Sequence, residues 1–419
     1  MNFDSPFSRS EQPSAVAPCK TACVAKRQSD DTLFAGVQLR IKALTGRSEP
    51  ATAREPGDDG PVMMSADDSP CQRQANQLGS TLRRFNRYRE ALPFAEAAND
   101  MSNTKKARKG ANPLQAPQPP ASACLTRLSG DGPELCRQLG IPADAITTED
   151  LNNPNTGFLA SVYRDEANNR FILVANDTDP QSLVDWKTNL ENSEGLATDQ
   201  YNAAYKLAKK LSTYDVKYDI SGYSKGGGMG QMMGLVNPDA KVMIFNSAGL
   251  PMSATASADK VAALAKRTTA YSAEGDLLTY MNETRDPAQL VQNAEYLKKE
   301  LLGQGSWLQK MRISYRNPEN PDAAQDADYA KELTKLTKLM DDQIEQVKRD
   351  GLPPPPVRAD YKEVVKGSLG LLARVAGAGA DTPNLGKQYQ HLMGNVLDPI
   401  KANFKGDREA LESFLENCG

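Results

Sequence analysis

The sequence of 419 residues predicts an α/β fold, in which a mainly parallel sheet is flanked by helices. Two observations support this prediction. Segments with strand character and segments with helix character alternate between residues 157 and 273, and such alternation favours a parallel sheet. Around Ser224, the spacing of the apolar residues changes from every second residue to the 3.6-residue period of a helix. In such sheets, binding and catalytic sites gather at the carboxyl ends of the strands, which is where Ser224 would lie.

The predicted sheet begins with two apolar segments. Residues 157–164 and 170–175 are separated by the short sequence DEANN, which predicts a strand pair joined by a turn. A helix is expected from Asp199, because apolar and aromatic residues recur there on one helical face. The elements predicted after Ser224 are a strand over residues 240–246, a helix around residues 261–265 and a strand near residues 268–272.

Residues 214–236 combine a strand, a turn and a helix around a reactive type of side chain. Apolar and polar residues alternate over residues 216–220, and Gly222 and Gly226 flank Ser224 in a Gly-x-Ser-x-Gly pattern. This layout is typical of the nucleophile elbow of serine hydrolases, in which a strained turn exposes the serine hydroxyl. We expect glycine at both flanking positions because the turn brings them close to neighbouring backbone, where a side chain would clash.

A second interpretation of the same glycine-rich segment is a phosphate-binding loop. Gly228, Gly230 and Gly234 form a loose dinucleotide-like pattern. A dinucleotide loop begins directly after its strand, however, whereas Gly228 lies eight positions beyond Ile220. The sequence also lacks a Walker-type Gly-Lys-Ser/Thr motif. These differences favour Ser224 as a nucleophile over a phosphate loop, with an incidental loop serine as the remaining alternative.

A serine nucleophile needs a general base and an acid that orients it. The chain has one histidine, His391, so either His391 is the base or the usual triad does not exist here. Asp276 lies just beyond the predicted strand near residues 268–272 and after Ser224, in the Ser–Asp–His order of α/β hydrolases. Asp276 is therefore the candidate acid. The alternatives are a turn aspartate beside Gly275 and a surface or core histidine without a catalytic role.

Charge, hydropathy and cysteines limit the class of protein. The net charge of −3 gives no overall sign to a partner, and we expect no nucleic-acid partner. The sequence contains no run of 18 apolar residues and no apolar N-terminal segment of the Sec type, so a soluble or peripheral protein is expected. All six cysteines lie outside the stretch from Ser224 to His391, which excludes disulfides from the catalytic core but not from its flanks.

Two further regions are expected outside the core elements. Residues 1–122 are rich in Ser, Pro, Ala, Asp and Arg and poor in periodic apolar residues, which predicts a largely disordered region and linker. Residues 123–419 would form the α/β-hydrolase-like domain. Within it, a helical insertion is expected at about residues 283–380, with one apolar stripe that ends before Gly351. This insertion can serve as a lid or as a supporting helical layer.

Residues 157–249 resemble the class 3 (fungal-type) lipases and related bacterial lipase-like effector proteins among the α/β hydrolases. The stretches that carry the resemblance are ANDTD at residues 175–179, VDWKTNL at 184–190 with its Asp-Trp and nearby Asn, GYSKGGG at 222–228 and FNSAGL at 245–250. The chain departs from the family pattern at Asn176 and Asp177, where arginine and glycine are usual, and at Tyr223, where histidine is common.

This resemblance implies a lipid-ester hydrolase. Ser224 would attack the ester carbonyl, His391 would transfer the proton, Asp276 would orient the imidazole, and the N–H groups of Thr178 and Lys225 would hold the oxyanion. No metal or organic cofactor is needed. The expected partner is a lipid or phospholipid substrate at a membrane surface. The alternative is a catalytically silent hydrolase fold, exported as a bacterial effector, that binds a host protein through its helical insertion.

Overall fold

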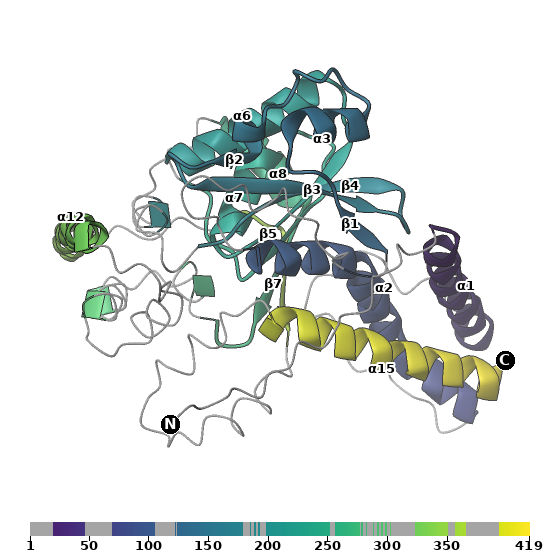
Figure 1. Cartoon of the computed structure of the whole chain (residues 1–419). Helices are drawn as coiled ribbons and strands as arrows, with labels where there is room; N and C mark the ends of the chain where they lie inside the picture. Colours follow the sequence, from purple (N-terminus) through teal and green to yellow (C-terminus); the bar gives the residue numbers. More distant parts are fainter. Residues whose placement is uncertain are drawn as a thin grey trace, which may run out of the picture.

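The structure, a computed structural model, describes most of the chain in several blocks. These blocks are residues 20–46, 69–104, 122, 124–178, 198–251, 256–276, 323–350, 357–365 and 394–419, with single positions between 185 and 192 and between 278 and 302. His391 lies outside the described residues. Figure 1 shows a central sheet with helices on both sides.

Within the described residues, eight strands form one sheet. They are β1 (Leu125–Arg127), β2 (Asn152–Asn153), β3 (Phe158–Asp165), β4 (Arg170–Ala175), β5 (Tyr218–Tyr223), β6 (Val242–Phe245), β7 (Thr268–Ala273) and β8 (Tyr361–Val365). Their order is β1-β3-β4-β5-β6-β7-β8, and β2 pairs with β3. The run from β4 to β8 is parallel, whereas β1, β2 and β4 each pair with β3 in the antiparallel sense. The predicted α/β fold with a mainly parallel sheet is therefore confirmed.

Local patterns place several of the predicted elements correctly. The strand pair around the DEANN turn is present as β3 and β4. The helix α6 (Asp199–Thr213) begins where it was expected, because the side chain of Thr198 caps its first turn by accepting a hydrogen bond from the N–H of Tyr201. After the turn at Ser224, β6, α8 (Ala258–Lys266) and β7 also occupy the predicted positions. Two short helices, α3 (Gly132–Leu139) and α4 (Thr148–Leu151), precede β3.

The two faces of the sheet are covered by different helices. Ile220 and Gly222 of β5 face α7 (Lys225–Gly234), since Cβ atoms built on Gly230 and Gly222 would meet Ile220 and the backbone of Gly226. Ser221, which lies between them, points the other way and donates a hydrogen bond of 2.8 Å to the carbonyl oxygen of Phe94. Successive side chains of a strand point to opposite faces. The helix that carries Phe94 therefore covers the face opposite to α7.

The helices of the N-terminal region differ from the sequence-based expectation. Residues 1–122 were predicted to be largely disordered, but α1 (Lys20–Thr45) and α2 (Pro70–Ser102) are helical, so the prediction is wrong for both segments. The start of α2 is fixed by a capping box between Ser69 and Gln72. The buried residues of α2 recur every three or four positions, but Arg, Asn and Gln between them obscure this stripe in the overall composition. They are Ala75, Leu78, Leu82, Phe85, Tyr88, Ala91, Phe94, Ala95, Ala97, Ala98 and Met101.

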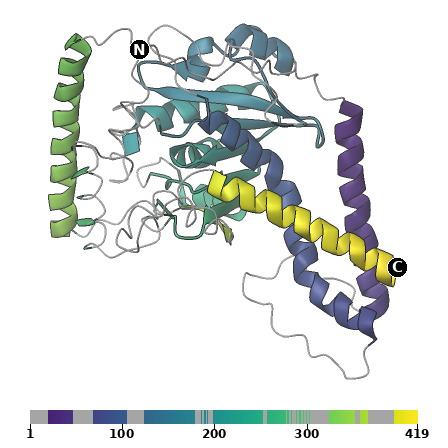
Figure 2. The ribbon, with the colours of Figure 1, turned by 60° about the horizontal axis from the view of Figure 1, so that its bottom comes forward.

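The apolar stripe of α2 divides between two clusters. From Tyr88 to Met101 it belongs to the main core, together with the sheet. Up to Phe85 it packs against α1 and α15 (Gly394–Cys418) in a second cluster. We call this second unit, made of α1, residues 70–85 of α2 and residues 404–418 of α15, the helical clasp. Figure 2 shows its three helices extending away from the sheet on the side opposite to α12 (Ala323–Asp350).

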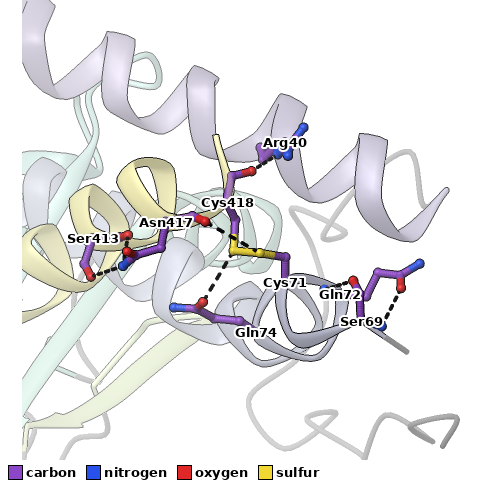
Figure 3. Close-up of a disulfide and its surroundings, with 8 residues drawn as sticks. All are labelled: Arg40, Ser69, Cys71, Gln72, Gln74, Ser413, Asn417 and Cys418. Carbon is purple, nitrogen blue, oxygen red and sulfur yellow. Dashed lines mark hydrogen bonds between the residues drawn. A yellow bond between two sulfur atoms is a disulfide. The ribbon is translucent and has the colours of Figure 1, made fainter. Parts of the chain in front are cut away.

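Two disulfides and a hydrogen bond hold the helices of the clasp to one another and to the start of the sheet. A disulfide joins Cys71 at the start of α2 to Cys418 at the end of α15, across 347 residues of sequence (Figure 3). A second disulfide joins Cys23 of α1 to Cys124, just before β1. Figure 3 also shows Arg40 of α1 donating a hydrogen bond to the carbonyl oxygen of Cys418. Both disulfides lie in the flanks of the chain, where the sequence had left disulfides possible.

The predicted insertion over residues 283–380 is described in part. The helix α12 ends at Asp350, directly before Gly351, as its apolar stripe predicted. Residues 361–365, in contrast, do not belong to a helical layer, because they form β8 and pair in parallel with β7. The division of the chain into domains at residue 122 stays a prediction. None of the described helices combines the length and apolarity needed to cross a membrane.

Candidate active site

Ser224 occupies a strained turn between β5 and α7. Its backbone angles, φ 54° and ψ −127°, are unfavourable for a residue with a side chain. Three hydrogen bonds hold the turn. The N–H of Ser224 donates to Phe245 O at 3.0 Å, and its carbonyl oxygen accepts from the N–H groups of Gly227 at 3.0 Å and Ala248 at 2.8 Å. Strain maintained by surrounding structure is characteristic of functional sites, so this turn is the first candidate for chemistry.

The glycines that flank Ser224 pack against backbone. A Cβ atom on Gly222 would lie 2.2 Å from the carbonyl oxygen of Gly226, and a Cβ atom on Gly226 would lie 2.4 Å from that of Ala175 at the end of β4. Neither backbone carbonyl can move aside as a flexible side chain can. Gly228 is constrained as well, since its Cβ atom would lie 2.1 Å from the hydroxyl of the fully buried Tyr201 and 2.9 Å from the carbonyl oxygen of Gly249. The glycine run therefore allows α7 to approach the sheet and α6 closely, and packing accounts for the loose dinucleotide-like pattern.

Asp276 lies at the same edge of the sheet as Ser224. It follows the end of β7 by three residues, and β7 and β5 are the two parallel neighbours of β6. The side chain is 2% exposed, and its Oδ2 accepts a hydrogen bond of 2.6 Å from the N–H of Thr279. The structure thus brings Asp276 to the strand ends that carry Ser224, whereas His391 lies outside the described residues.

Tyr223 provides electrostatic evidence that these strand ends converge. Burial raises the pKa of Tyr223 well above its ordinary value, and the negative charges of Asp177 and Asp276 raise it further. Asp177 follows β4 and Asp276 follows β7, while Tyr223 is the last residue of β5. Carboxylates that follow two different strands therefore act electrostatically on the residue that precedes Ser224, and burial together with these charges favours the neutral phenol of Tyr223.

The loop after β4 is held from two sides. Asn189 Nδ2 donates a hydrogen bond of 2.9 Å to Thr178 Oγ1. On the other side, Ser102 Oγ at the end of α2 donates to Asp177 Oδ2 at 2.8 Å, and Asn176 Nδ2 donates to Thr104 O at 3.4 Å. The sequence-based interpretation missed the contacts from Ser102 and Thr104, because it treated residues 1–122 as disordered. The buried stripe of α2 was the signal that could have revealed them.

Lys225 combines a backbone position beside the nucleophile with a fully buried side chain. It is the first residue of α7 and is 1% exposed. Its Nζ lies 2.7 Å from Oδ1 of Asp185, which is 0% exposed. The same Oδ1 accepts a hydrogen bond of 2.6 Å from Gln200 Nε2. An ammonium group paired with a carboxylate is not available as a neutral base for Ser224, which disfavours a Ser–Lys dyad.

The comparison with protein families agrees with this geometry. Residues 127–311 match the family model described as Phospholipase-like, Tle-like phospholipase domain. The matched region contains Ser224 and Asp276 but not α1, α2, α12 or α15. No curated protein matches the chain. Residues 127–311, less than half of the chain, are therefore similar to the Tle-like phospholipase domain, from a lipase-like α/β-hydrolase family of bacterial effectors, and this likeness implies hydrolysis of lipid esters.

Proposed function

We propose that the protein is a serine hydrolase that cleaves carboxylic esters of lipids, as a lipase or phospholipase. The observation that carries this proposal is the conformation of Ser224, which is held at positive φ between a parallel strand and a helix, with glycines packed against backbone on both sides. A structural serine has no need of such strain, whereas a nucleophile elbow depends on it to present the hydroxyl. The family assignment supports lipid esters, and its phospholipase description favours phospholipids among them.

The proposed mechanism proceeds through an acyl-enzyme. Ser224 Oγ attacks the ester carbonyl while His391 accepts its proton and then passes it to the departing alcohol. Water, deprotonated by His391, releases the fatty acid and restores Ser224. Asp276 orients His391, and the position of Asp276 at the strand ends beside the elbow supports this role. The N–H groups of Thr178 and Lys225 donate to the oxyanion that forms at each step.

A catalytically silent binding module is the second candidate. Asp177 stands in the loop proposed to supply an oxyanion donor, and a carboxylate near a developing negative charge opposes its stabilisation. Oδ2 of Asp177 accepts a hydrogen bond from Ser102 at the end of α2, so one of its two carboxylate oxygens contacts α2. An exported effector that binds a protein through this fold would tolerate such a residue. The two candidates differ in one observable property, the reactivity of the Ser224 hydroxyl.

Covalent labelling with a fluorophosphonate separates the candidates. The full chain and the variants Ser224→Ala and Ser221→Ala are incubated with the reagent, and the modified peptide is located by mass spectrometry. Ser221 is the matched control because it lies on the same strand but points to the opposite face, toward Phe94. Labelling of the full chain and of Ser221→Ala, with loss in Ser224→Ala, supports the enzyme. A folded chain that stays unlabelled at Ser224 supports the silent module.

Substrate class is then tested by hydrolysis. Phospholipid vesicles, a triacylglycerol emulsion and a short p-nitrophenyl ester are compared under the same conditions. The phospholipase proposal expects the highest rate of fatty-acid release from phospholipid vesicles. A higher rate on the triacylglycerol emulsion contradicts the phospholipase assignment but leaves the lipid-ester hydrolase in place.

A further inference from the structure

The ion pair between Lys225 and Asp185 stands out among the contacts of the elbow. Both side chains are buried, at 1% and 0% exposure, and their charged atoms lie 2.7 Å apart. Gln200, in the first turn of α6, donates to the same carboxylate oxygen at 2.6 Å. Two charges are therefore removed from water directly beside the strained turn at Ser224. The proposed mechanism uses the backbone N–H of Lys225 and assigns no role to its side chain.

Stability alone does not explain a pair of this kind. Removing two charges from water costs about as much as their attraction returns, and apolar residues of similar volume are often equally stable in the same place. A buried ion pair does differ from an apolar contact in one respect, because it is directional and fixes the relative position of the elements that carry it. The relevant question is which elements Lys225 and Asp185 join.

The pair joins the two sides of the proposed oxyanion hole. Lys225 contributes one proposed donor through its own N–H, and Asn189 binds the side chain of Thr178, which contributes the other. Asp185 and Asn189 are four residues apart at helical positions, a spacing that places both on one helical face. Asn192 continues this face and donates a hydrogen bond of 3.1 Å to Gly249 O in the loop after β6. The side chains of Asp185, Asn189 and Asn192 therefore contact the elbow helix, the loop after β4 and the loop after β6, respectively.

We propose that Asp185 and Lys225 are positioning residues that set the separation between the N–H groups of Lys225 and Thr178. This inference rests on the proposed function. Asp185 holds Lys225 at the start of α7, Gln200 holds Asp185, and Asn189 holds Thr178 from the same segment. Because an oxyanion forms only along the reaction path, an error in this separation lowers kcat and leaves the binding of substrate in its ground state nearly unchanged.

The test replaces the pair by apolar residues in the full chain. Lys225→Met/Asp185→Leu removes both charges together, so neither is left buried alone, and the melting temperature should stay close to that of the wild type. On p-nitrophenyl butyrate, kcat should fall by about 10- to 100-fold while KM changes by less than about twofold, as expected for a displaced transition-state donor. A folded double variant with wild-type kcat overturns the inference.

A matched control and a milder variant complete the test. Lys210→Met makes the same substitution on α6. Lys210 forms an ion pair of 2.6 Å with Asp150, and this pair does not involve the elbow. The substitution should therefore leave kcat and KM unchanged. Gln200→Met keeps the ion pair and removes only the second contact to Asp185, so kcat should fall by a smaller factor, about 3- to 10-fold. If the double variant does not fold, Gln200→Met decides, and wild-type kcat in that variant overturns the inference.

Fluorophosphonate labelling distinguishes failure of this inference from failure of the proposed function. A wild-type chain that is labelled at Ser224, together with a double variant that is labelled more slowly and has the lower kcat, supports both. A labelled wild type with an equally fast double variant overturns the positioning role and leaves the hydrolase in place. An unlabelled wild type overturns the hydrolase, and the positioning role falls with it.

Discussion

The elbow and the helical clasp are built in opposite ways. The elbow, formed by β5, Ser224 and α7, is assembled from one short stretch of chain and held by backbone hydrogen bonds and glycine packing. The clasp is assembled from three helices at the two ends of the chain, and it is held by an apolar cluster, the Cys71–Cys418 disulfide and ion pairs such as Arg84–Asp407. The difference teaches that local strain can be recognised in a sequence pattern, whereas a long-range clasp depends on contacts that no local pattern contains.

The helix α2 connects these two regions. Phe85 packs in the clasp and Phe94 packs in the sheet core, and both are 0% exposed. At its end, Ser102 contacts Asp177 in the loop after β4. The clasp is therefore continuous with the loop proposed to hold an oxyanion donor. Four sets of variants test whether the two regions are separable, from the largest expected effect to the smallest.

Ser224→Ala should have the largest effect and should be confined to the elbow. Comparable nucleophiles lose about six orders of magnitude in kcat when they are removed. His391→Ala should cause a similar loss if it is the base. Melting temperature should not change in the Ser224→Ala protein, because its hydroxyl is not needed to hold the clasp. Ester hydrolysis at even a tenth of the wild-type rate by Ser224→Ala would exclude Ser224 as the nucleophile.

Phe94→Ala and Phe85→Ala compare the two halves of α2 directly. Each removes a fully buried ring and should lower the free energy of unfolding by about 3–5 kcal/mol. Chemical denaturation, followed by far-UV circular dichroism and by esterase activity, measures the result. If the regions unfold together, both variants shift one transition. An early transition in Phe85→Ala that leaves activity intact would show that the clasp unfolds on its own.

Removing the Cys71–Cys418 disulfide should destabilise the chain without changing its chemistry. A cross-link that closes so long a loop typically contributes about 2–4 kcal/mol, mainly by restricting the unfolded chain. Cys71→Ala/Cys418→Ala should therefore melt at a lower temperature, while kcat on a soluble ester stays at the wild-type value where the protein is folded. Reductant should lower the melting temperature of this variant further, through Cys23–Cys124. A large loss of kcat in the folded variant would show that the clasp controls the site.

Gly226→Ala and Gly406→Ala should have the smallest effects, and these should be opposite in sign. A Cβ atom at Gly226 meets the carbonyl of Ala175 at 2.4 Å, so overpacking should cost about 1–3 kcal/mol. In α15, no atom lies within 4 Å of a Cβ atom on Gly406, and alanine should stabilise this helix by about 0.4–1 kcal/mol. Thermal unfolding of both variants measures the contrast. Equal effects would contradict the difference in packing between elbow and clasp.

The sequence predicted those parts of the fold whose signal is local. The β3–β4 pair, α6, β6, α8 and β7 all lie where their periodicity placed them. The same approach failed for α1 and α2, since the apolar stripe of α2 lies among many charged residues and composition outweighed its spacing. It also assigned residues 361–365 to a helical insertion, because a short edge strand carries little periodic signal and is defined by its pairing with β7.

For the candidate site too, the sequence predicted the features with a local signal and missed the contacts between distant segments. The motif around Ser224 and the chain order of Ser224, Asp276 and His391 were readable without a structure, and the role of His391 stays a prediction. The contacts of Lys225 with Asp185 and of Ser102 with Asp177 were not readable, since each joins residues that are 40 or more positions apart.

The sequence by itself determined the turn at Ser224, because a strand period, a helix period and two obligatory glycines meet within one stretch of chain. Only the tertiary structure decided what surrounds that turn. The placement of Asp276 at the strand ends near Ser224, the carboxylate that binds Lys225, the end of α2 beside Asp177 and the disulfide that joins the two ends of the chain all depend on how distant segments pack. Hydrogen bonding within a turn or helix acts between near neighbours in sequence, whereas the burial of apolar surface selects partners by their position in space.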